Sequence, residues 1–285
     1  MVLSKPLSYD CTRHIIKHTD PNLRILLSLR CPSIQAFEKS ISFKCQQLQF
    51  SPNWTSINGC CYINNLLLRG RSEPIRMKRL EINVTFLRLP GSVKYHSKEV
   101  DFRVTGFGFD LLKKILDVSS FPLNFYGIGY ISEDWTTFEH PVFRSARNIF
   151  ISNKENNQPE LFRSLLKHPN KSITVQSRLP WITFQTITDN WKTTQRKVGT
   201  SLTIERVHTE DVENVLNQIL QEEQHRENKN GDLIIPLYQD KSLKISSGDI
   251  HEKLPSDPKF WNDLMNFLKL EVIDVDSELY MSEIR

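Results

Sequence analysis

Two prolines near the start of the chain restrict what its first segment can fold into. Asp20 precedes Pro21, and Cys31 precedes Pro32. Proline is tolerated at the first position of a helix but breaks a helix interior. Asp20 is also a favourable N-cap, and Ser8 offers a similar cap further upstream. The segment is therefore predicted to form three short helices, each beginning at one of these positions.

The second predicted helix is apolar over more of its surface than the roughly 100° stripe that contact with one core requires. An isoleucine pair adds an apolar edge to the first helix. These apolar residues are Ile15, Ile16, Leu23, Ile25, Leu26, Leu27 and Leu29. We expect part of this surface to face a partner. The alternative is that the helices only cap the domain that follows.

The pattern of residues across this segment resembles an F-box. It has a Pro-Leu opening, an isoleucine pair, an Asp-Pro step, a leucine-rich helix and a cysteine near the third helix. The resemblance implies that the segment binds the Skp1 adaptor of a cullin-RING ubiquitin ligase. The partner-binding residues that it implies are Pro6, Leu7, Ile15, Ile16, Leu23, Ile25, Leu26, Leu27, Leu29 and Pro32.

Longer phrases of the sequence extend the resemblance over most of the chain. PLSYDC and RCPSI in the first segment, with PELFRSLL and LPWITFQTITDNW further on, are similar to the nematode F-box C proteins. Proteins of that family carry an F-box-like segment followed by an F-box-associated domain of unknown function. The resemblance implies a substrate-recognition adaptor whose C-terminal half binds an unknown target protein.

Composition is that of an ordinary folded protein. The chain has 285 residues, of which 39% are hydrophobic and 25% are charged, so it can bury a large core. Its 37 basic and 33 acidic residues leave a formal charge of +4, which is too weak a bias to indicate nucleic acid. Without a leader-like start or an apolar run long enough to span a membrane, we expect a cytoplasmic or nuclear protein with no membrane partner.

The second half of the sequence alternates short strands with amphipathic helices. Predicted strands begin at Asn148, Ser172, Ser201 and Leu233, with spacings of 24, 29 and 32 residues. This internal repeat is typical of a leucine-rich-repeat-like solenoid, in which no unit buries its own apolar face. A doubly wound α/β sheet would show the same alternation. We favour the curved repeat because the first half also offers short strands that could extend one sheet.

The fold class predicted from the sequence is therefore α+β or α/β, with a short helical segment before a leucine-rich-repeat-like body. Four parts are predicted: an F-box-like segment at 1–40, a mixed region at 41–146, a repeat region at 147–273 and a frayed tail at 274–285.

Two further segments carry structural predictions. The basic stretch RGRSEPIRMKR contains Arg69, Arg71, Arg76, Lys78 and Arg79. It could bind an acidic partner, but we predict a solvated loop. After Pro255 and Pro258, residues 256–270 are predicted to form a helix that closes the repeat, with Phe260, Trp261, Leu264, Phe267 and Leu268 on one face. The five cysteines lack paired spacing and are predicted to be reduced, buried thiols.

No catalytic motif stands out in the sequence. His14 and His18 lie one helical turn apart, a spacing that can hold zinc, but nothing nearby supplies further ligands. We predict no catalytic residue, no cofactor and no metal site. The alternatives to an adaptor are a protein-binding repeat scaffold without ligase contact and an enzyme whose site lacks a recognisable motif.

Overall fold

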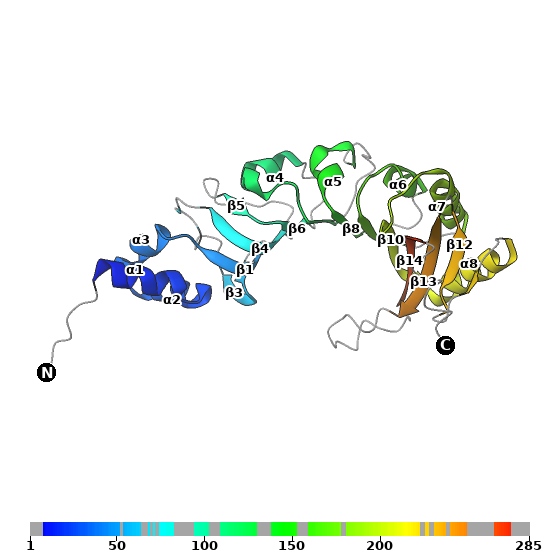
Figure 1. Cartoon of the computed structure of the whole chain (residues 1–285). Coiled ribbons are helices and arrows are strands. Elements are labelled where there is room, and N and C mark those ends of the chain that lie inside the picture. The colour runs from blue at the N-terminus through cyan, green and yellow to red at the C-terminus, as the bar shows by residue number, and fades with distance from the viewer. Residues whose placement is uncertain are drawn as a thin grey trace, which may run out of the picture. The chain divides into compact units, whose positions relative to one another are not determined.

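The fold is mixed α+β, with an N-terminal helical segment and a body built mostly of β-sheet (Figure 1). The computed structural model describes residues 8–51, 54–63, 68, 71, 74–82, 94–102, 109–129, 138–152, 159–177, 181–222, 226–227, 231–237, 240–249 and 265–274. The chain divides into two compact units, Met1–Tyr126 and Gly127–Arg285. The finer division at residues 40, 146 and 273 stays a prediction.

The first unit begins with the three predicted helices, which are confirmed. Its elements are α1 (Tyr9–His18), α2 (Pro21–Arg30), α3 (Pro32–Lys39), β1 (Lys44–Phe50), β2 (Trp54–Ile57), β3 (Cys60–Ile63), β4 (Ile75–Ile82), β5 (Tyr95–His96), β6 (Glu99–Phe102), α4 (Phe109–Ile115) and the 3-10 helix η2 (Val118–Ser120). Its strands lie in the order β3-β2-β1-β4-β6, and β5 also pairs with β4. The strand β7 (Phe125–Ile128) spans the boundary between the units.

The centre of the first unit's sheet is parallel. β1 pairs with β4, and β4 pairs with β6, all in parallel, whereas β1, β2 and β3 are antiparallel. Leu48 lies beside Leu80, which lies beside Val100, and all three are buried. β4 begins inside the predicted basic loop, so that prediction is wrong for Arg76, Lys78 and Arg79. The loop prediction missed that Ile75 and Met77 alternate with these charged residues and are buried in the core.

The second unit contains the predicted strand–helix alternation. Its elements are α5 (Pro141–Ser145), β8 (Asn148–Ser152), α6 (Pro159–Leu165), β9 (Ser172–Gln176), α7 (Trp181–Thr193), β10 (Ser201–His208), α8 (Thr209–Glu222), β11 (Arg226–Glu227), β12 (Leu233–Pro236), β13 (Lys241–Asp249) and β14 (Met265–Asp274). Its strands lie in the order β8-β9-β10-β14-β13-β12-β11.

The first three predicted repeat strands are parallel neighbours in matching register. Asn148 pairs with Ser172, which pairs with Ser201. Ile151, Val175 and Ile204 consequently stack in a row, and all three are buried. α6 contacts α7, and α7 contacts α8. Phe184 and Trp191 of α7 are buried in the core.

The regular pattern ends after β10. β12 is the predicted fourth strand, but β13 and β14 separate it from β10, and it pairs antiparallel with β13. The predicted helix at 256–270 is wrong from residue 265 onward, because those residues form β14 between β10 and β13. Residues 256–264, with Phe260, Trp261 and Leu264, lie outside the described part of the chain.

The residues of β14 explain why it is a strand. Leu268, Leu270 and Val272 are buried and alternate with Lys269 and Glu271, which is the period of a strand and not of a helix. Pairing with a strand on each side satisfies the backbone of β14 on both edges.

Phe267 depends on a glycine in the neighbouring strand. It lies opposite Gly248 of β13, and a Cβ atom on that glycine would come within 3.0 Å of the Phe267 ring. The missing side chain of Gly248 therefore leaves room for the aromatic ring.

All five cysteines are free, but the prediction that they are buried is wrong. Cys11, Cys60 and Cys61 are exposed. Cys60 and Cys61 lie on β3, the last strand of its side of the sheet, where side chains are less covered. In the part of the chain that the structure describes, no helix is both long and apolar enough to cross a bilayer.

One buried histidine makes the stability of the second unit depend on pH. His168 is 2% exposed and lies against the rings of Phe138 and Phe143, and neither of its ring nitrogens has a hydrogen-bond partner among the described residues. Burial lowers the pKa of His168; Glu139 opposes this shift, and the nearby arginines reinforce it. The folded protein therefore favours the neutral imidazole.

Because the pKa of His168 is lowered on folding, its neutral form supports stability above about pH 6.5, the pKa of an unfolded histidine, and that support is lost as the pH falls. We expect urea unfolding to show up to about 1 kcal/mol less stability at about pH 5.5 than at about pH 6.5 from this group. His168→Phe should remove that difference. An equal pH dependence in wild type and His168→Phe would contradict the assignment.

Candidate partner-binding site

The helical segment is built from capped helices, as the sequence predicts. The Ser8 hydroxyl accepts a hydrogen bond from the Cys11 amide at 3.3 Å. The Asp20 carboxylate accepts from the amides of Asn22 and Leu23 at 2.8 and 3.2 Å. Both caps satisfy amides that a helix leaves free in its first turn. They define where α1 and α2 begin, and hence which side chains share a face.

α2 has a buried side and an exposed side. Arg24 and Ile25 are buried on one side. On the other side, Leu23, Leu26, Leu27 and Leu29 are exposed by 36–53%. Since successive helix residues turn by about 100°, these leucines cover roughly half of the helix circumference. We call these four leucines the leucine face. Ile15 of α1 is also exposed.

The structure separates the predicted binding residues into two groups. Ile16 and Ile25 are 4% and 2% exposed, so they support the segment from within. Pro32 is exposed at the start of α3. Pro6 and Leu7 lie outside the described residues. The members with accessible side chains are the four residues of the leucine face, Ile15 and Pro32.

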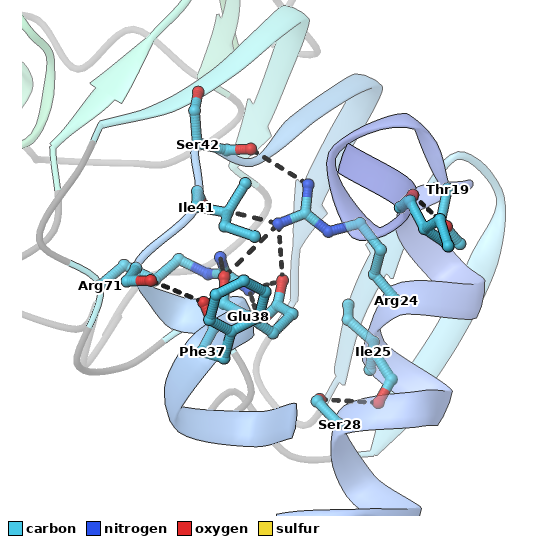
Figure 2. A network of polar contacts seen from close by, with 11 residues as sticks. Thr19, Arg24, Ile25, Ser28, Phe37, Glu38, Ile41, Ser42 and Arg71 are labelled. Carbon is cyan, nitrogen blue, oxygen red and sulfur yellow. Dashed lines mark hydrogen bonds and ion pairs between the residues drawn. The ribbon is translucent and has the colours of Figure 1, made fainter. Parts of the chain in front are cut away.

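A buried ionic cluster fixes the helices to the sheet, and Figure 2 shows its members pointing toward one another. Nη2 of Arg24 on α2 lies 3.0 Å from Oε1 of Glu38 on α3. Nη2 of Arg71 donates to both carboxylate oxygens of Glu38, at 2.6 and 2.7 Å. All three side chains are at most 3% exposed. We call these residues the Arg-Glu-Arg cluster.

Backbone and aromatic groups complete the surroundings of the cluster. Nη1 of Arg24 donates to the carbonyl of Ser42 at 3.0 Å. The guanidinium carbons of Arg71 and Arg24 lie 4.5 and 5.2 Å from the centroid of the Phe43 ring, within cation–π range. Burial lowers the pKa of Arg24, and the Glu38 carboxylate opposes that shift. The carboxylate thus holds two cations in a region closed to water.

A second polar contact joins the helices to the sheet. The Tyr62 hydroxyl of β3 donates to Oδ1 of Asn22 at the start of α2, at 2.7 Å. α2 is therefore tied at its first turn and again at Arg24. Its exposed leucines consequently project from a supported helix.

Sequence reasoning missed the Arg-Glu-Arg cluster. Arg71 was assigned to a solvated loop, but it is buried against Glu38. One feature of the sequence could have indicated that Arg24 is buried: it lies beside Ile25, on the side of α2 away from most of the leucines. In the sequence, Arg24 is 14 residues from Glu38 and 18 residues from Ser42, and Glu38 is 33 residues from Arg71. A local sequence pattern cannot show which residues pair over such separations.

The two histidines considered as metal ligands lie side by side on α1. The rings of His14 and His18 are 4.6 Å apart between centroids. Within the described ranges, no group of three or more potential ligands could hold a metal ion.

Comparison with known families covers the middle of the chain. A family model described as a domain of unknown function (DUF3557) matches residues 58–208. The chain belongs to this family. No curated protein and no solved structure matches it. The match is consistent with the expected domain of unknown function behind the helical segment.

The limits of the DUF3557 match give the cluster a specific position. The matched residues begin at Asn58, after α1, α2, α3 and β1. Arg71 belongs to the DUF3557 domain, whereas Arg24 and Glu38 precede it. The Arg-Glu-Arg cluster therefore connects the helical segment with the DUF3557 domain.

Removing the shared carboxylate should destabilise this connection. We expect Glu38→Gln to lower the free energy of unfolding by about 3–5 kcal/mol, because it leaves two buried guanidinium groups without a counter-charge. Urea unfolding measures the change. Glu139→Gln is the control, since Glu139 pairs with Arg144 at 3.1 Å on the surface and its loss should cost less than about 1 kcal/mol. Similar losses for the two variants would contradict a structural role for the cluster.

Proposed function

We propose that this protein is a substrate-recognition adaptor of a Skp1-cullin-F-box type ubiquitin ligase. The observation that carries the proposal is the leucine face, a set of large apolar side chains exposed on one short capped helix. Exposed apolar patches mark interaction sites more often than scattered single residues do. The F-box-like residues of the segment support a Skp1-type adaptor as the partner.

The way the leucine face is held favours this role. A helix that is already held in place presents the same side chains to every partner molecule. The Arg-Glu-Arg cluster and the Tyr62–Asn22 hydrogen bond support α2 from behind. Because the helices are already ordered before a partner binds, association costs less conformational entropy.

We further propose that the protein is a member of the nematode F-box C family and that its body is a leucine-rich-repeat-like α/β structure. The turns before successive strands supply the support. Amides of Asn124 and Phe125 donate to the Lys98 carbonyl, and those of Lys171 and Ser172 donate to the Arg147 carbonyl. The amide of Ser201 donates to the Lys171 carbonyl in the same way. Each such turn is thus bonded to the turn of an earlier strand, as in a solenoid.

In this proposal the body binds an unknown target protein and the ligase supplies the chemistry. The protein then needs no catalytic residue, cofactor or metal of its own. Its work would take place in the cytoplasm, the nucleus or both. The alternative is a protein-binding repeat scaffold, which would use the same exposed surfaces without contacting a ligase.

Substituting one leucine of the face tests the adaptor role. We expect wild type to capture a Skp1-type protein in a pull-down, and Leu26→Asp to lower that capture at least about tenfold, since a buried charge at an interface centre is costly. Leu220→Asp on α8 is the matched control, because Leu26 and Leu220 are 43% and 44% exposed. Circular dichroism should show that both variants remain folded.

Two results would contradict the proposal. One is a wild-type protein that captures no Skp1-type protein under conditions where a known F-box protein does. The other is equal capture by Leu26→Asp and wild type. The first result would favour the scaffold alternative.

A further inference from the structure

A second surface of the helical segment has the features of an anion site. An open cavity of about 390 Å³ lies between α1 and the connection from α3 to β1. Its lining is Asp10, Arg13, His14, Lys17, Ser40, Ile41 and Ser42. We infer that this cavity binds a phosphate group, either as the free ion or as a monoester, through Arg13, Lys17 and Ser42. The inference does not depend on the proposed adaptor role.

The cations of the cavity have no protein partner to neutralise them. Arg13 and Lys17 are exposed and lie one turn apart on α1. Among the residues that the structure describes, neither makes an ion pair or hydrogen bond. Like charges at this spacing repel each other. A dianion between the two side chains would replace that repulsion with attraction.

The lining also offers donors that suit a phosphate group. A phosphate monoester presents three acceptor oxygens. The guanidinium of Arg13, the ammonium of Lys17 and the hydroxyl of Ser42 are donors from two sides of the cavity. Arginine suits such an anion because its planar fork can donate two parallel hydrogen bonds. A carboxylate offers fewer oxygens and less charge to the same donors.

The Arg-Glu-Arg cluster adds positive charge behind the cavity. It holds two guanidinium groups against one carboxylate, all of them buried. Nη1 of Arg24 donates to the carbonyl of Ser42 (Figure 2). Ser42 also lines the cavity, so this charge is bonded to a lining residue. Charges in a region closed to water are screened less than surface charges. The cluster thus favours an anion in front of Ser42.

Asp10 is the acidic residue of the lining, and removing its charge should change the phosphate affinity in the opposite direction from removing Arg13 or Lys17. Its carboxylate would repel a bound phosphate. Asp10→Asn should therefore tighten binding, about two- to fivefold, while Arg13→Gln and Lys17→Gln should each weaken it about tenfold. A solvated basic surface without a site would not respond to the three changes in this pattern.

Isothermal titration calorimetry of the full chain with O-phosphoserine, inorganic phosphate and serine measures these effects. We expect both phosphates to bind and serine to give no heat. Tighter binding of O-phosphoserine would identify a phosphorylated side chain as the ligand, and tighter binding of inorganic phosphate would identify the free ion. Arg30→Gln, on exposed α2 outside the cavity, should change affinity less than about twofold.

Three outcomes would overturn the inference. They are no binding of either phosphate to wild type, unchanged affinity in the Arg13→Gln, Lys17→Gln double variant, and an equal loss in Arg30→Gln. None of these measurements involves a Skp1-type protein, so failure here is distinct from failure of the adaptor proposal.

Discussion

Two guanidinium groups share the carboxylate of Glu38 in a region closed to water, and the arrangement of the helical segment depends on that contact. Arg24 and Glu38 come from α2 and α3, whereas Arg71 belongs to the DUF3557 domain. A buried ion pair is not by itself a large source of stability, because desolvation offsets much of the attraction. Its geometric demands are strict, however, since a misplaced partner leaves a charge unpaired. The cluster therefore selects one docking of α2 and α3 on the sheet.

This docking decides which apolar residues of the segment remain available. With Arg24 and Ile25 turned inward, the leucines on the opposite side of α2 are left exposed. The same contact brings Ser42 of the α3–β1 connection next to α1, where the cavity with Arg13 and Lys17 lies. One buried cluster thus supports two different surfaces: the apolar leucine face and the basic cavity.

Local sequence signals were sufficient for most of the secondary structure. Asp20 and Pro21 define the start of α2, and strand–helix alternation predicted β8, α6, β9, α7 and β10. The same reasoning failed at β14, because the bulky residues from Phe260 to Leu268 were assigned a helical period although Leu268, Leu270 and Val272 alternate. It also failed at Arg71, whose basic neighbours suggest a loop. In both places the deciding contacts are with distant strands or helices.

The sequence by itself determined the three short helices, the strand–helix alternation from β8 to β10 and the apolar character of α2, because each follows from neighbours within a few residues. Only the tertiary structure decided that Ile16 and Ile25 are buried while the leucine face is exposed, that β14 lies between β10 and β13, and that Arg24, Glu38 and Arg71 meet. The physical reason is that burial and charge pairing join residues far apart in the chain. A local sequence pattern cannot identify which distant residue will be the partner.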